Sequence, residues 1–219
     1  MRLTEQGESD MASITAAPRT GLLSVPALTG AGFLVSWAAG LSVPVPPAGL
    51  EASGSEIVSA CSGHGGALAA QFVLTEGLPA VALALVPLAI GRAARWSRAG
   101  RIAAGAGLVA AVVSLVQFAI GLGLVATSSP GTAHALLEAL NRADGVKMFF
   151  LAAVGAAGAL AGVLPRWLRY TGIALAVAIA GSGIGYALLL SGMATLAYVS
   201  LPLLILFVTG SGIALGRKA

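Results

Sequence analysis

Six long apolar stretches dominate this chain, and they decide which solvent it can fold in. They cover residues 22–43, 66–90, 102–127, 146–164, 170–190 and 194–215. A helix needs about 20 apolar residues to cross about 30 Å of hydrocarbon, and each stretch is close to that length. Backbone polar groups must be satisfied internally in lipid, so the segments have to be helical. We therefore predict an all-α, polytopic bundle with six transmembrane helices.

Composition supports this interpretation and limits the number of domains. Hydrophobic residues make up 58% of the chain, charged residues 9%, and the mean hydropathy is +0.95. An ordinary soluble domain does not have this balance. Six spans use most of the 219 residues. We expect a cytosolic tail over 1–20, one six-span domain over 21–216 and a cytosolic C-terminal tail over 217–219.

Basic residues are distributed unequally between the loops on the two sides of such a bundle. Ten of the twelve fall on the side of the N-terminus: Arg2, Arg19, Arg92, Arg95, Arg98, Arg101, Arg166, Arg169, Arg217 and Lys218. Only Arg142 and Lys147 remain for the other side. Cytoplasmic loops carry the excess of Lys and Arg, which predicts cytoplasmic termini in the cell membrane. Arginine outnumbers lysine, and Ala and Gly are abundant, as in bacterial proteins from GC-rich genomes.

The distribution of charges also disfavours a cleaved secretory signal and a nucleic-acid partner. The leader contains Glu5, Glu8 and Asp10 and precedes a long apolar run, unlike a short-cored secretory signal, so we expect the first span to be retained. Cleavage near residues 38–39 would leave five spans. The basic residues are dispersed through short loops, which favours contact with anionic lipid over nucleic acid.

Both long outer connections show helical periodicity. In 55–64, the residues Ile57, Ala60, Cys61 and His64 recur on one helix face. After Ser129 and Pro130, a helix start is followed by a second apolar face at Ala133, Leu136, Leu137 and Leu140. We predict two short interfacial helices on the outer surface of the bilayer, with Gly145 turning the chain into the fourth span.

Two sequence blocks are similar to a known group of proteins. They are SEIVSACSGHGGALAAQFVLTEGLPAVALALVPLAI, at 55–90, and NRADGVKMFFLAAVGAAGALAGVLPRWLR, at 141–169. Their layout resembles an uncharacterised family of multi-span bacterial integral membrane proteins, a domain of unknown function, over about residues 50–170. The resemblance implies a helical membrane fold. It implies no activity, because that family has no established one.

Glycines at four-residue spacing predict tight packing between spans, because small residues let helix backbones approach closely. The pairs are Gly158/Gly162, Gly181/Gly185 and Gly212/Gly216. The same faces could hold a second copy of the chain or another membrane protein. The run Gly181–Gly185 superficially resembles a nucleotide-binding loop, but that loop needs a preceding strand. We predict no cofactor.

The outer connections contain the candidate metal ligands Cys61, His64, His134 and Glu138. Zinc accepts this ligand set, but the spacing is not that of a known zinc motif. No serine elbow with a paired histidine and acid is present. We therefore predict no metal and no catalytic residue, and we consider an enzyme the less favoured interpretation.

Glu76 is the one charged residue deep in any predicted span. Counting about 1.5 Å per residue from residue 67 puts it roughly 13 Å from the outer edge of the hydrocarbon. Ser114 falls at a similar depth and Gln117 about one turn further out, so we predict an intramembrane polar site of Glu76, Ser114 and Gln117. Because no cation of the predicted spans faces it, Glu76 is expected to be uncharged at pH 7. Pro79 predicts a kink beside it.

Three functions fit these features. The first is a small transporter, permease-like subunit or transport accessory with a protonatable Glu76, although no inverted half-repeat supports a stand-alone transporter. The second is a non-catalytic structural or regulatory partner of other membrane proteins, with Glu76 buried and dry. The third is a membrane-embedded enzyme with an outer-face cluster at His64 and His134.

The predicted orientation can be tested with the single thiol of the chain. Cys61 lies in the first outer connection, so a membrane-impermeant maleimide should label it on intact cells. The labelled fraction should match that obtained after lysis. Labelling that appears only after lysis would reverse the orientation.

Overall fold

A computed structural model describes residues 24–45 and 49–217 of the chain. All regular structure in these ranges is helical. The elements, in chain order, are α1 (Val25–Leu41), α2 (Gly54–Cys61), α3 (Gly65–Phe72), the π-helical segment η2 (Val73–Gly77), α4 (Leu78–Ala93), α5 (Arg98–Ala126), α6 (Pro130–Leu160), α7 (Arg166–Ala187), α8 (Ser191–Ala194) and α9 (Ala197–Gly216). The predicted tail 1–20 and residues 218–219 lie outside the described residues.

Five helical stretches in the described chain are long and apolar enough to cross a membrane. They are Gly65–Ala93, Arg98–Ala126, Pro130–Leu160, Arg166–Ala187 and Ser191–Gly216. Helix α1 is apolar but shorter, with 17 residues. At about 1.5 Å per residue it is roughly 25 Å long, at the lower limit for a span. The all-α class and a multi-pass membrane protein are therefore supported, and α1 is the segment on which a sixth span depends.

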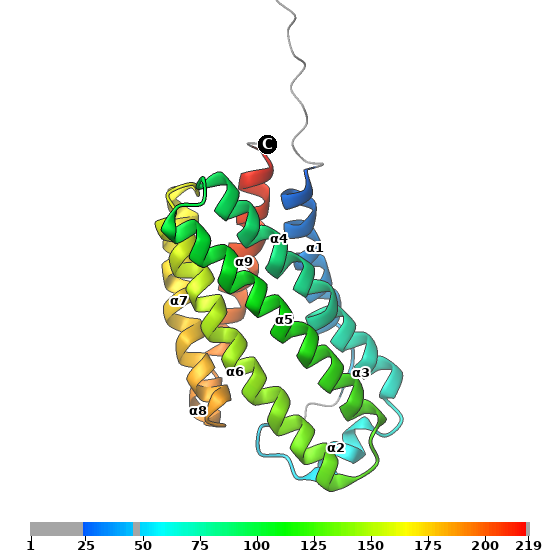
Figure 1. Cartoon of the computed structure of the whole chain (residues 1–219). Helices are drawn as coiled ribbons and strands as arrows, with labels where there is room; N and C mark the ends of the chain where they lie inside the picture. The colour runs from blue at the N-terminus through cyan, green and yellow to red at the C-terminus, as the bar shows by residue number, and fades with distance from the viewer. Residues whose placement is uncertain (1–23, 46–48, 218–219) are drawn as a thin grey trace, which may run out of the picture.

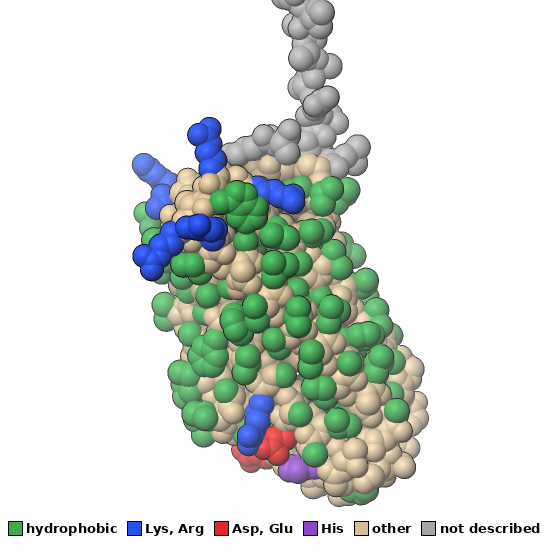
Figure 2. Space-filling model, viewed as in Figure 1, with side chains coloured by type: hydrophobic (Ala, Val, Ile, Leu, Met, Phe, Trp, Pro, Cys, Tyr) green, Lys and Arg blue, Asp and Glu red, His purple; other side chains and the backbone are tan. Residues whose placement is uncertain are grey.

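The long helices form one bundle in which consecutive helices run in opposite directions (Figure 1). Helix α6 packs most extensively against α5 and α7, and α1 lies beside α9, so the two ends of the described chain meet. Lysine and arginine side chains gather at the end of the bundle where α1 begins and α9 ends (Figure 2). Acidic and histidine side chains appear at the opposite end of this face, with one further basic side chain.

The outer segment predicted after Pro130 is not a separate interfacial helix. It is the first part of α6, which continues without a break from Pro130 to Leu160. Gly145, predicted to turn the chain, is buried within this helix. A Cβ atom there would lie 2.5 Å from the backbone nitrogen of Ala187 on α7. A glycine is therefore required at position 145 because α6 and α7 touch there, and the chain does not bend at this residue.

The other predicted outer helix is present as α2. Ser53 and Glu56 form a capping box at its start, in which each side chain binds the backbone of the other residue. These hydrogen bonds lower the pKa of the Glu56 carboxyl. Ile57 is buried in a small apolar cluster with Leu124 of α5 and with Leu137 of α6. The helix therefore packs across the end of the bundle, on the extended first part of α6.

Close helix contacts explain most of the glycine spacing, with one exception. A Cβ atom at Gly158 would lie 2.9 Å from the ring of Phe207, and residues 212 and 216 of α9 meet α1. Gly181 and Gly185 face residues 196 and 194, just after α7. Gly162 has no heavy atom near its Cβ position and a φ of +75°. The prediction of a helix contact is wrong for Gly162, which instead ends α6 in a left-handed conformation.

The crossing of α6 and α7 gives a test of this packing. A Cβ atom at Gly155 would lie 2.7 Å from the carbonyl oxygen of Gly172, which is backbone and cannot rotate away. We expect Gly155→Ala to lower the melting temperature in detergent, because overpacking at this contact should cost about 1–3 kcal/mol of stability. Gly105→Ala is the matched control, because nothing lies within 4 Å of its Cβ position in the middle of α5. Equal melting of the two variants would contradict the contact.

Candidate functional site

The candidate site is built around a widened helical turn in the second long helix. Val73–Gly77 is π-helical, and the amide of Leu78 donates to the carbonyl of Val73, five residues earlier. Pro79 follows directly and has no amide to donate to an earlier carbonyl. A π-turn of this kind is a recognised response to strain within a helix. The sequence predicted an irregularity beside Pro79, and the structure places it at Glu76.

Side chains from the neighbouring helices bind the carbonyl groups of this turn. The hydroxyl of Ser36 on α1 donates to the Leu74 carbonyl at 2.5 Å. The hydroxyl of Ser114 on α5 lies 3.2 Å from the Glu76 carbonyl and 2.5 Å from its Oε2. One hydroxyl proton serves both of these acceptors. The irregular turn is thereby fixed between α1 and α5.

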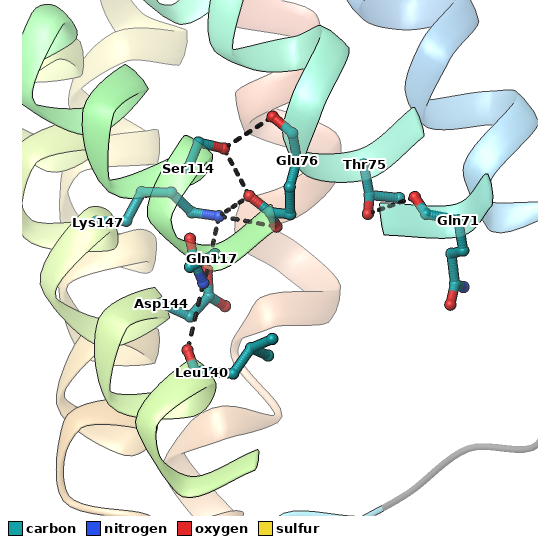
Figure 3. A network of polar contacts seen from close by, with 8 residues as sticks. All are labelled: Gln71, Thr75, Glu76, Ser114, Gln117, Leu140, Asp144 and Lys147. Carbon is teal, nitrogen blue, oxygen red and sulfur yellow. Dashed lines mark hydrogen bonds and ion pairs between the residues drawn. The ribbon is translucent and has the colours of Figure 1, made fainter. Parts of the chain in front are cut away.

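Lys147 of α6 neutralises one charge at the centre of the site (Figure 3). Its Nζ lies 3.0 Å from Oε1 of Glu76, 2.8 Å from Oε2 and 2.9 Å from Oδ1 of Asp144. An ammonium group has three protons, so all three are used. The lysine bridges two carboxylates, one on its own helix and one on η2.

Gln117 of α5 completes the group. Its Nε2 donates to Oδ1 of Asp144 at 3.2 Å and to the carbonyl of Leu140 at 3.3 Å. Both of its protons point at oxygens, which fixes the orientation of the amide. The remaining atom, Oε1, is buried and has no hydrogen-bond partner. We call Glu76, Ser114, Gln117, Asp144 and Lys147 the Glu76 cluster.

The Glu76 cluster is buried but not sealed. The side chain of Lys147 is 7% exposed, that of Glu76 12%, and that of Asp144 21%. With both carboxylates ionised and the lysine protonated, the cluster carries one negative charge in excess. Taking such charges out of water costs several kcal/mol per ion unless partners compensate. The cluster is therefore either a structural anchor that lowers stability or a functional site whose net charge changes.

One sequence prediction about Glu76 rested on a wrong premise. A neutral Glu76 was expected because no cation of the spans faced it. Lys147 does face it, at hydrogen-bond distance. From the sequence, Lys147 was expected at the outer end of the fourth span, which was predicted to start at residue 146. Since α6 begins at Pro130, Lys147 lies well inside the helix and only 6% of the residue is exposed.

The structure brings together the residues named from the sequence and adds two more. Ser114 touches Glu76 directly, whereas Gln117 reaches it through Asp144 and Lys147. Asp144 and Lys147 were missed. The signal that could have found them is the four-residue spacing of Ala133, Leu137, Asn141 and Gly145, which continues one buried helix face through the supposed turn.

The outer-face residues do not form a comparable group. The Nδ1 of His64 lies 3.1 Å from the Ser62 carbonyl, and that of His134 lies 3.3 Å from the Ala52 carbonyl. Glu138 pairs with Arg142 one turn along α6. Within residues 24–45 and 49–217, no three His, Cys, Asp or Glu side chains are grouped to hold a metal ion.

Cys61 is half-buried at the end of α2. Burial raises the pKa of its thiol above the usual value, because it disfavours the thiolate. The thiolate is the form that reacts with maleimides. Labelling of Cys61 should therefore be slow at neutral pH and faster as the pH rises.

No protein-family model, no curated protein and no solved structure matches this chain. The resemblance to an uncharacterised bacterial membrane family therefore stays a prediction. What can be said of the site rests on its own geometry.

The Glu76 cluster predicts an unequal response to removing two basic residues of the same helix. Lys147→Met leaves two buried carboxylates unpaired, which should cost about 3–5 kcal/mol of stability. Arg142→Met removes a more exposed pair one turn apart, worth about 1 kcal/mol or less. Melting in detergent measures both. Adding Glu76→Gln and Asp144→Asn to Lys147→Met should restore much of the loss. Equal effects of the two single changes would contradict the burial of the ion pairs.

Proposed function

We propose that this protein is a small transporter, permease-like subunit or transport accessory in which the Glu76 cluster binds and releases a proton. The observation that carries the proposal is that two carboxyl groups, of Glu76 and Asp144, share one ammonium group inside an apolar bundle. One proton on a carboxyl group makes the cluster neutral, and releasing it restores the charge. Ionisable groups buried in spans usually mark ion pathways or proton relays.

The arrangement around Glu76 fits a group that changes its protonation state better than it fits a fixed structural anchor. Glu76 lies on a π-turn, and such turns are frequent at functional sites. Lys147 faces two carboxylates, so protonation of one leaves it the other as a partner. The lack of an inverted half-repeat in the sequence favours a subunit or accessory over a stand-alone transporter.

The proposal includes a membrane location and an orientation. We infer a six-span protein of the bacterial cell membrane, with α1 as the first span and both termini in the cytoplasm. The short length of α1 is within the range that spans can have. The gathering of basic side chains at one end of the bundle supports the orientation (Figure 2). Anionic lipid of the inner leaflet is the expected contact of that end.

A structural or regulatory partner of other membrane proteins is the second candidate. An apolar groove of about 670 Å³ lies on the surface of α9, bordered by Leu34 and Leu41 of α1 and by Trp167 of α7. A groove of this kind between helices suits an apolar partner. The glycine pairs give less support than the sequence implied, since most of them already contact helices of the same chain. The third candidate, an enzyme at His64 and His134, gains no support from the contacts of these two side chains.

The proton-binding role can be tested in proteoliposomes containing a pH-sensitive dye. A pH gradient should drive proton flux through the wild-type protein. Glu76→Gln keeps the shape and hydrogen bonding of the side chain but removes its titratable group, so flux should fall to that of protein-free vesicles. Glu138→Gln changes a partly exposed acid of α6 and should leave flux unchanged.

Folding of both variants is checked by their elution as single species at equal reconstitution. Wild-type flux in Glu76→Gln would contradict the transport proposal. The structural-partner function would then be the better explanation of the Glu76 cluster.

A further inference from the structure

The excess negative charge of the Glu76 cluster can be neutralised by a small cation other than the proton. Two carboxylates face one ammonium group, and every proton of that ammonium is already used. Arg142, the nearest other basic residue along α6, pairs with Glu138. In an interior of low polarity, the remaining negative charge attracts any small cation that can reach it.

The oxygen atoms beside Asp144 are suited to a metal cation. Oε1 of Gln117 is the decisive atom, because the residue is 1% exposed and this oxygen has no partner. The other half of the same amide is held by Asp144 and Leu140, so Oε1 stays within the cluster. A buried acceptor without a donor lowers the stability of the fold, and a cation would remove that cost. Hard cations take carboxylate, amide and carbonyl oxygens as ligands.

We propose that the Glu76 cluster binds a small monovalent metal cation, such as sodium or potassium, between the Asp144 carboxylate and Oε1 of Gln117, in competition with the proton. The inference rests on the proposed function, since it names a second ion for the same site. Lys147 stays paired, and the cation neutralises the charge that lysine leaves over. A single positive charge suffices, because the excess is one.

The groups facing the site come from η2, α5, α6 and α7. Helix α6 supplies Asp144 and Lys147, and η2 supplies Glu76. Helix α5 contributes the uncharged Ser114 and Gln117. From α7, Tyr186 lies within electrostatic range of Asp144 and Lys147. A tyrosine ordinarily keeps its proton at neutral pH, so Tyr186 adds no charge to the site.

A cavity with hydroxyl groups in its wall lies beside Tyr186 of α7. It has a volume of about 570 Å³ and is lined by Tyr186, Tyr198, Ser191 and Thr195. Hydroxyl groups in its wall can replace part of the hydration shell of an entering cation. Asp144 is the most exposed member of the ion-paired trio.

The test is thermal unfolding of the purified full chain in detergent at constant ionic strength. Choline chloride is replaced stepwise by sodium chloride and, separately, by potassium chloride at pH 8. Because a ligand of the native state stabilises it by mass action, the melting temperature should rise and saturate with at least one of the metal salts. Once the pH falls below the pKa of the competing carboxyl group, one-for-one competition should raise the half-saturating concentration by about tenfold per pH unit. Equal melting in all three salts at pH 8 would overturn the proposal.

Two variants locate the ion. Asp144→Asn removes the excess charge, and Gln117→Leu removes Oε1 without changing any charge, so both should abolish the response to salt. Glu138→Gln, on the same helix as Asp144, should keep it. A response retained in Gln117→Leu would overturn the proposed ligand set. If Asp144→Asn does not fold, Gln117→Leu decides alone.

Failure of this inference is distinct from failure of the proposed function. Proton flux without a salt response removes the metal ion and leaves the proton role. A salt response without proton flux removes the transport proposal and leaves the cation site, then as a structural ion.

Discussion

The pairing of Lys147 with Glu76 and Asp144 is the interaction on which the interior of this bundle depends. It joins η2 to α6, and Gln117 and Ser114 join α5 to the same group. Charged groups tolerate little displacement in a low-dielectric interior, because each lost contact leaves a charge without compensation. The Glu76 cluster therefore sets the relative register of three helices. Apolar packing alone discriminates weakly between registers in lipid, where side chains outside and inside are equally apolar.

Close backbone contacts complete what the ion pairs begin. Helices α6 and α7 approach so closely at Gly155 and Gly172 that the Cβ of either would collide with the carbonyl of the other. The Gly145 contact with Ala187 lies on the same interface, and Gly145 directly follows Asp144 in the sequence. Tight packing on one side of α6 and ion pairs on the other hold this helix in place. A site that exchanges protons or metal ions needs such a rigid support, because its geometry must survive a change of charge.

The Glu76 cluster is compatible with a structural role and with an ion-binding role, and its chemistry distinguishes the two. As an anchor it would be fully compensated, with equal numbers of positive and negative groups. It has one carboxylate too many and one amide oxygen without a donor. Both features lower stability if they stay as they are. A proton on a carboxyl group would remove the excess charge, and a small cation beside Asp144 would remove both features. This is the physical reason for preferring an ion-handling role over a purely structural one.

Sequence alone indicated an apolar environment, the helical class and the approximate position of the long helices other than α6, because each of these depends on the hydrophobicity of a local stretch of chain. It also identified Glu76, Ser114 and Gln117, since polar residues in apolar stretches are conspicuous. It misplaced Lys147, because Gly145 was taken as a turn and the fourth span as starting after it. Only tertiary structure could decide this point. A glycine inside a helix is tolerated where another backbone packs against it. A lysine is stable in the interior where carboxylates pair with it, as those of η2 and α6 do here. Both conditions depend on neighbours that are distant in sequence.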